Sequence, residues 1–125
     1  MAGNERPLSP RLSVYRWLPA MVASIAHRIT GVLLLLFVPF YLWMLHAMTG
    51  SPEEFEQAIL LLHSPLGRLS LWLVSVALTY HFCNGIRFLC LDAGWGESRG
   101  MMRTSARAVL TIAAGAGLFF GVILW

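Results

Sequence analysis

The sequence contains no lysine and few charged residues of any kind. Its nine basic residues are all arginines, and charged residues make up only 12% of a chain that is 58% hydrophobic. A soluble domain has about 25% charged residues, so this composition is typical of a membrane protein. The net charge is +3, but the arginines flank apolar runs and form no separate basic patch, which argues against nucleic-acid binding.

Cysteine is scarce as well. Cys83 and Cys90 lie seven positions apart in one predicted helix, where their side chains cannot form a disulfide. The sequence has no Cys-x-x-Cys-His motif for covalent haem attachment. It also has too few cysteines to hold an iron–sulfur cluster and shows no flavin-binding motif, so we expect no catalysis by the isolated chain.

Long charge-free runs dominate the rest of the chain. Three of them come close to the roughly 20 residues that a bilayer crossing requires. Lipid cannot hydrogen-bond to unpaired backbone groups, so we expect each run to cross as an α-helix. The sequence therefore predicts an all-α membrane protein with a single domain over residues 1–125. The transmembrane helices are expected at about 24–49, 68–92 and 104–125, after an N-terminal arm over residues 1–20.

The segment between the first two spans has the pattern of a helix start. Ser51 is a suitable N-cap, Pro52 fits the first helical position, and Glu54 can close a capping box. We therefore expect a short helix over residues 51–63, lying on the outer surface of the membrane.

The third span has small residues at every fourth position, namely Ala113, Gly117 and Gly121. This spacing is typical of a face that lets two membrane helices approach closely. The pattern leaves open a second interpretation, in which the helix faces lipid and its glycines are incidental.

Arginine placement predicts how the chain crosses the membrane. The loop between the first two spans holds only Arg68, whereas the segments on the other side hold the remaining arginines. Cytoplasmic segments are enriched in arginine, so we expect a cytoplasmic N-terminus and a periplasmic C-terminus. The arginines on the cytoplasmic side are then Arg6, Arg11, Arg16, Arg28, Arg87, Arg99, Arg103 and Arg107.

His81 is an ionisable residue inside the second apolar run. It lies six positions before Arg87, which on a helix is about 9 Å from the inner boundary of the membrane. No acidic residue lies near it in the run, and a neutral imidazole is a good metal ligand. Gly85 lies one turn further on the same face and leaves room for a flat ring against the helix. The alternative interpretation of His81 is a simple hydrogen bond to a neighbouring helix.

A second polar cluster lies at the inner end of the first span, in the stretch SIAHRIT. Ser24 and Arg28 are four positions apart and share a helix face, and His27 lies between them. This segment offers a hydroxyl, an imidazole and a guanidinium at the inner boundary. In the alternative interpretation, Arg28 is only an interfacial anchor that contacts lipid phosphate.

One haem accounts for both clusters. Its iron would be held by His81 and its acidic edge by arginine, the natural partner of carboxylates. Arg28 and Arg87 both lie near the inner boundary. Arg87 is rotated away from His81 on an ideal helix, so it either reaches around to the haem or serves only as an anchor.

Three stretches of the chain resemble the cytochrome b membrane anchor subunit of succinate dehydrogenase, the larger of its two anchors. They are RPLSPRLSVYRW (6–17), SIAHRITG (24–31) and HFCNGIRFLCLDAG (81–94). Any one of these motifs is weak evidence, but their joint order and spacing are specific. The motifs cover about a third of the chain, and the three-span order agrees over nearly all of it.

The resemblance implies a role in succinate:ubiquinone oxidoreductase, respiratory complex II. Such subunits hold the flavoprotein and iron–sulfur subunits at the inner membrane surface, and ubiquinone receives electrons from succinate through iron–sulfur clusters. By position, His81 is similar to an axial ligand of haem b. Ser24 and Arg28 match residues of the quinone pocket. His27 and Arg28 match residues near the haem propionates.

The sequence departs from the family pattern at two positions. Phe88 stands where many members have a second histidine, so any contact which that histidine makes to a propionate or a proton is lost. Arg11 stands where some members have histidine. Neither change affects His81.

A low-spin haem in this family needs two histidine ligands. We expect His27 at the inner surface and His46 and His63 toward the outside, so none of them matches the depth of His81. The second ligand is therefore expected from another chain, the smaller anchor subunit.

Other functions are kept as alternatives. The nearest are the same anchor role in a fumarate reductase and a haem-free structural anchor. A small transporter or channel subunit would have polar groups along a path through the membrane, whereas those of this chain gather in the inner half. The chain reaches RPLSP within six residues of Met1, which leaves no room for a mitochondrial presequence, so we expect a bacterial inner membrane before a mitochondrial one.

Overall fold

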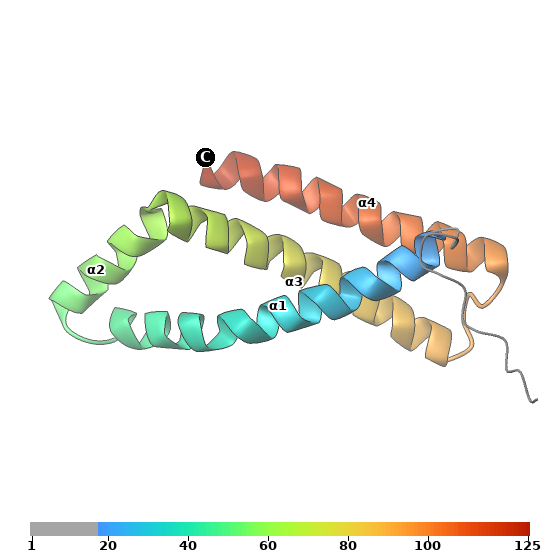
Figure 1. Ribbon diagram of the computed structural model, residues 1–125, viewed down its shortest axis with the longest axis horizontal. Helices are drawn as coiled ribbons and strands as arrows, with labels where there is room; N and C mark the ends of the chain where they lie inside the picture. The colour runs from blue at the N-terminus through green and yellow to red at the C-terminus, as the bar shows by residue number, and fades with distance from the viewer. Residues whose placement is uncertain (1–17) are drawn as a thin grey trace, which may run out of the picture.

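The computed structural model describes residues 18–125, so most of the predicted N-terminal arm lies outside the described residues. The described part is all-helical, and three of its helices are long and apolar enough to cross a membrane, which confirms the predicted fold class at that level. These three are α1, α3 and α4, and a short helix α2 joins α1 to α3 (Figure 1). The helices are α1 (Pro19–Met48), α2 (Pro52–His63), α3 (Pro65–Asp92) and α4 (Arg99–Leu124).

The helices form an open bundle with two distinct ends (Figure 1). The start of α1, the end of α3 and the start of α4 lie at one end, while α2 and the C-terminus lie at the other. The described arginines other than Arg68 belong to the first end, hereafter the arginine end. The second end, which includes α2, is called the α2 end.

Local chemistry sets where the helices begin. Proline occupies the first turn of α1, α2 and α3, where its missing N–H leaves no hydrogen bond unmade. Ser51 accepts from the Glu54 N–H and Glu54 accepts from the Ser51 N–H, so the predicted capping box is present. Ser64 and Ser98 are the N-caps of α3 and α4, and each accepts through its side-chain oxygen, from the Gly67 N–H and the Met101 N–H.

The three long helices begin earlier than the expected transmembrane segments. Helix α1 begins at Pro19, where residue 24 was expected, and α4 begins at Arg99, where residue 104 was expected. The reason is that hydropathy marks where lipid contact starts, whereas a proline or a serine cap marks where the helix starts. The extra turns carry Arg99 and Arg103 beyond the apolar region.

The small-residue face of α4 packs against α3. The indole Nε1 of Trp72 donates a hydrogen bond to the Gly117 carbonyl at 2.8 Å. A Cβ atom on Gly117 or on Gly121 would lie 3.7 Å from the indole of Trp72, which is ordinary van der Waals contact. At Gly117 and Gly121, the structure therefore confirms that this face packs against a neighbouring helix.

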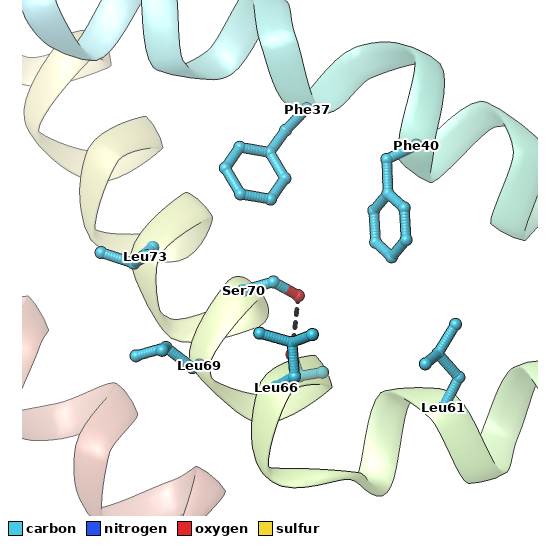
Figure 2. Close-up of a pocket in the computed structure, with 8 residues that line it drawn as sticks. Phe37, Phe40, Leu61, Leu66, Leu69, Ser70 and Leu73 are labelled. Carbon is cyan, nitrogen blue, oxygen red and sulfur yellow. Dashed lines mark hydrogen bonds between the residues drawn. The ribbon is translucent and has the colours of Figure 1, made fainter.

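At the α2 end, an apolar cavity of about 260 Å³ lies between α1, α2 and α3 (Figure 2). Near it, the Tyr41 hydroxyl and the Ser70 hydroxyl lie 3.2 Å apart and link α1 to α3. The cavity wall contains no titratable side chain, so it is not where polar chemistry would take place. The side chains that line it include Phe37, Phe40, Leu61, Leu66, Leu69 and Leu73.

We expect Gly117→Leu to destabilise the bundle by about 1–3 kcal/mol, because the added side chain must displace Trp72 from the α3–α4 contact. The measurement is thermal unfolding of the detergent-solubilised protein. Gly115→Leu is the matched control, since a Cβ atom there meets nothing within 4 Å. Equal losses in the two variants would contradict the assignment of Gly117 to the packed face.

Candidate functional site

Two imidazoles lie against each other where α1 meets α3 toward the arginine end. The rings of His27 on α1 and His81 on α3 are stacked, with centroids 3.9 Å apart and planes 10° from parallel. Both side chains are half-buried. The structure thus brings together two of the predicted site residues that are 54 positions apart in the sequence.

Two glycines make room for this pair. A Cβ atom on Gly31 would lie only 3.0 Å from Cε1 of His81, so the imidazole rests directly on the backbone of α1. A Cβ atom on Gly85 would lie 3.8 Å from Nε2 of His27. Gly85 was expected to leave room for a flat ring, and the ring beside it in this structure is the imidazole of His27.

The hydrogen bonds of His81 determine which of its nitrogens carries the proton. Its Nδ1 lies 3.1 Å from the His27 carbonyl oxygen and 3.2 Å from the Thr30 hydroxyl. The carbonyl can only accept, and the Thr30 hydroxyl directs its own hydrogen to the carbonyl of Ala26 or of His27. Nδ1 is therefore the donor. The lone pair then belongs to Nε2, which has no hydrogen-bond partner within residues 18–125.

His27 presents a polar atom that the described residues leave unsatisfied. Its Nε2 is buried and has no hydrogen-bond partner between residues 18 and 125. The edge of the Phe88 ring packs nearby, with ring centroids 5.2 Å apart, and offers no hydrogen bond. Buried polar atoms are rarely left unpaired, so an unpaired one calls for an explanation such as a ligand or a partner chain.

The expected depth of His27 is wrong. The sequence predicts that His27 lies at the inner surface, at a depth that does not match that of His81. Helix α1 instead begins at Pro19 and crosses α3, so His27 lies two turns inside the helix and beside His81. The two rings are stacked in parallel, however, so neither directs a nitrogen at the other.

Ser24 and Arg28 lie on the same helix as His27 but do not join the imidazole pair. Arg28 is exposed and Ser24 is half-buried. Neither side chain forms a hydrogen bond or an ion pair with another residue in the described part of the chain. Both are therefore available to a molecule that approaches α1 from outside the bundle.

Arg87 contacts α4 and does not reach around to His81. Its side chain is 8% exposed. Nε donates to the Ser105 hydroxyl at 3.0 Å, and one terminal nitrogen donates to the Met102 carbonyl at 3.3 Å. The other terminal nitrogen donates to the side-chain oxygen of Asn84 at 3.4 Å. Of the two arginines considered from the sequence, Arg28 is the one left free to bind an anion.

Three residues around this site had no predicted role. Thr30 contacts His81, while Tyr80 and Asn84 both donate to the Ala23 carbonyl on α1, at 2.6 and 3.2 Å. A weak signal for them exists, since each is polar, lies within a few positions of a site histidine and interrupts an apolar run. The sequence does not show which helix they contact.

The sequence matches the family described as succinate dehydrogenase/fumarate reductase transmembrane subunit over residues 2–122. A succinate dehydrogenase cytochrome b556 subunit of Coxiella burnetii is 35% identical over 97% of this chain and 98% of its own length. The protein of the same name from Paracoccus denitrificans is 39% identical over 86% of this chain and 82% of its own length. A mitochondrial succinate dehydrogenase cytochrome b560 subunit of Sus scrofa is 33% identical over 93% of this chain and 71% of its own length.

The three long apolar helices and the sequence comparisons agree on the class of protein. Three apolar helices of spanning length and relatives that cover nearly the whole chain make this a multi-pass membrane protein. The chain belongs to the succinate dehydrogenase/fumarate reductase transmembrane subunit family.

Proposed function

We propose that this chain is the membrane-anchoring cytochrome b subunit of a succinate:ubiquinone oxidoreductase. It binds haem b and helps to form the site at which ubiquinone is reduced. The chain itself carries no dehydrogenase chemistry, which belongs to a flavoprotein subunit and an iron–sulfur subunit. The observation that carries the proposal is the hydrogen-bonded state of His81, whose Nδ1 donates to the His27 carbonyl and leaves Nε2 available.

The donor set suits a haem better than a bare metal ion. No group of three or more His, Cys, Asp or Glu side chains that could hold a metal ion occurs within residues 18–125. A haem iron already has four ring nitrogens, so the protein supplies only axial ligands. A ligating histidine almost always donates its other N–H to a carbonyl or carboxylate, which is the arrangement found at His81. The haem, when bound, supplies one-electron redox chemistry.

His27 and Arg28 fit the acidic edge of the same group. The unpaired Nε2 of His27 can donate to a propionate, and the exposed guanidinium of Arg28 can form a charge-assisted pair with one. Gly85 keeps the space beside His27 free of a side chain. Among the predicted haem contacts, only His81 is proposed as an iron ligand.

The second axial ligand is proposed to come from the smaller anchor subunit. His27 and His81 stand side by side with their rings parallel, so they do not direct their nitrogens at one shared point where an iron would be held. His27 is therefore unsuited to the role, although it lies close enough to His81. His46 and His63 are exposed and lie toward the α2 end.

Ser24 and Arg28 are proposed to bind the quinone. The oxygens of a quinone gain negative charge on reduction, and a guanidinium and a hydroxyl at fixed positions stabilise that charge. Both side chains lack partners in the part of the chain that the structure describes, and they are one helical turn apart on α1.

The orientation of the chain in the membrane is inferred from the arginines gathered at the arginine end. We propose that this end faces the cytoplasm of a bacterium, where the flavoprotein and iron–sulfur subunits dock, and that the C-terminus faces the periplasm. A bacterial inner membrane is preferred to a mitochondrial one, although relatives of both kinds are similar to this chain. A fumarate reductase anchor would use the same residues, and the family description includes it.

His81→Ala is expected to remove or shift most of the sharp b-type α-band in the reduced-minus-oxidised spectrum of the purified complex, because an iron ligand is lost. His63→Ala is the matched control, since His63 is exposed and its Nδ1 contacts only the Ile59 carbonyl of its own helix. An unchanged band in His81→Ala would move the ligand elsewhere, and no band in the wild type would indicate a haem-free anchor.

Thr30→Val is expected to weaken haem retention by about 10-fold or more, because partners that orient a ligating histidine contribute about 10–100-fold to affinity. Valine keeps the shape of threonine and loses only the hydroxyl near Nδ1 of His81. Thr30→Ser keeps the hydroxyl and should bind haem like the wild type. The measurement is haem per complex after dilution and repurification, and equal haem content in Thr30→Val and wild type would contradict the assignment.

Ser24→Ala and Arg28→Leu are each expected to lower kcat/KM for ubiquinone reduction by about 10–100-fold, since each removes a positioned donor. Succinate oxidation with a water-soluble artificial acceptor should be unchanged, because that reaction does not use the membrane site. If both reactions fall equally, the residues support assembly of the complex and do not bind quinone.

A further inference from the structure

Asn84 is a fully buried amide in an apolar bundle, three positions after His81 on α3. Its Nδ2 donates to the Ala23 carbonyl on α1 at 3.2 Å, and its Oδ1 accepts from Arg87 at 3.4 Å. The orientation of the amide is forced, because a carbonyl can only accept and a guanidinium can only donate. Both ends of the side chain are therefore satisfied by groups on defined helices.

Arg87 holds this amide from the far side. Its remaining hydrogen bonds, to the Ser105 hydroxyl and the Met102 carbonyl, both reach α4. The guanidinium forms no ion pair with an acidic side chain of residues 18–125 and is held by neutral acceptors. The result is a continuous chain of hydrogen bonds from α1 through Asn84 and Arg87 to α4.

On α1, this chain of hydrogen bonds ends at the carbonyl of Ala23, next to the proposed site residues. Ala23 is fully buried and directly precedes Ser24, and His27 follows one turn later. Its carbonyl accepts a second inter-helix bond, from the Tyr80 hydroxyl at 2.6 Å. Two bonds from α3 to one backbone atom set the height and rotation of this part of α1.

We propose that Asn84, oriented by Arg87, is a positioning residue for the quinone and haem contacts of the chain. It touches neither group. It holds the backbone of α1 at Ala23 and thereby places Ser24 and His27 relative to His81. This inference rests on the proposed function of Ser24, His27 and His81.

The test compares two substitutions in the assembled complex. Asn84→Leu keeps a similar volume and removes both hydrogen bonds. Asn84→Asp keeps the oxygen that accepts from Arg87, so this variant is expected to fold even if Asn84→Leu does not. It loses the N–H that donates to the Ala23 carbonyl and places a second acceptor there. We expect KM for a short-chain ubiquinone to rise about 10-fold or more in both, because a misplacement of about 1 Å can cost on the order of 100-fold in rate. The haem α-band should also broaden or shift, while succinate oxidation with an artificial acceptor stays unchanged.

Trp72→Phe is the matched control for loss of stability alone. It removes the hydrogen bond from α3 to the Gly117 carbonyl, toward the opposite end of the bundle. It should lower the melting temperature of the complex without changing KM for ubiquinone or the α-band. Ser24→Ala is measured alongside, since it reports directly on the proposed quinone site.

The outcomes separate the two claims. A raised KM in the Asn84 variants with an unchanged KM in Trp72→Phe supports the positioning role. A lowered melting temperature in all three variants with unchanged KM and α-band overturns it and makes Asn84 an ordinary packing residue. If Ser24→Ala also leaves KM unchanged, the proposed quinone site fails and the positioning role fails with it.

Discussion

The close approach of α1 to α3 is the constraint on which the site depends. Ala23 is fully buried in the contact, and Gly31 lets the ring of His81 rest on the backbone of α1. A larger residue at either position would separate the helices. The stacking of His27 on His81 and the hydrogen bond from His81 to the His27 carbonyl would then be lost together, because both need the same short distance.

Polar groups at this crossing are paired almost completely, as expected where water is absent. Asn84, Tyr80 and Arg87 direct all their described bonds to backbone carbonyls, a hydroxyl or one another. Two imidazole nitrogens are exceptions among residues 18–125, namely the buried Nε2 of His27 and the half-buried Nε2 of His81. Within the described residues the bundle satisfies a buried guanidinium without any carboxylate, yet it leaves one nitrogen unpaired on each of the two stacked imidazoles. The open bonding positions are therefore at His27 and His81.

The outer surface of the bundle supports a role as one part of a larger assembly. Large apolar side chains are exposed along α1 and α4, including Leu35 and Leu36 on α1 and Leu118 and Val122 on α4. Lipid can cover such a surface, and so can the helices of another subunit. In the proposed haem site, the stacked histidines would supply one iron ligand, His81, and a second would come from another chain.

The sequence by itself determined the number of spanning helices, the capping box at Ser51 and Glu54, and the family, because these depend on local runs, local caps and motif spacing. It also pointed to His81, whose depth can be counted along one helix from Arg87. Tertiary structure alone decided that His27 stacks on His81, that Gly85 faces His27 and that Arg87 is used by α4. These are relations between helices, and they depend on crossing angle and rotation. Such geometry is set by packing among residues far apart in the chain, so no periodicity within one helix reveals it.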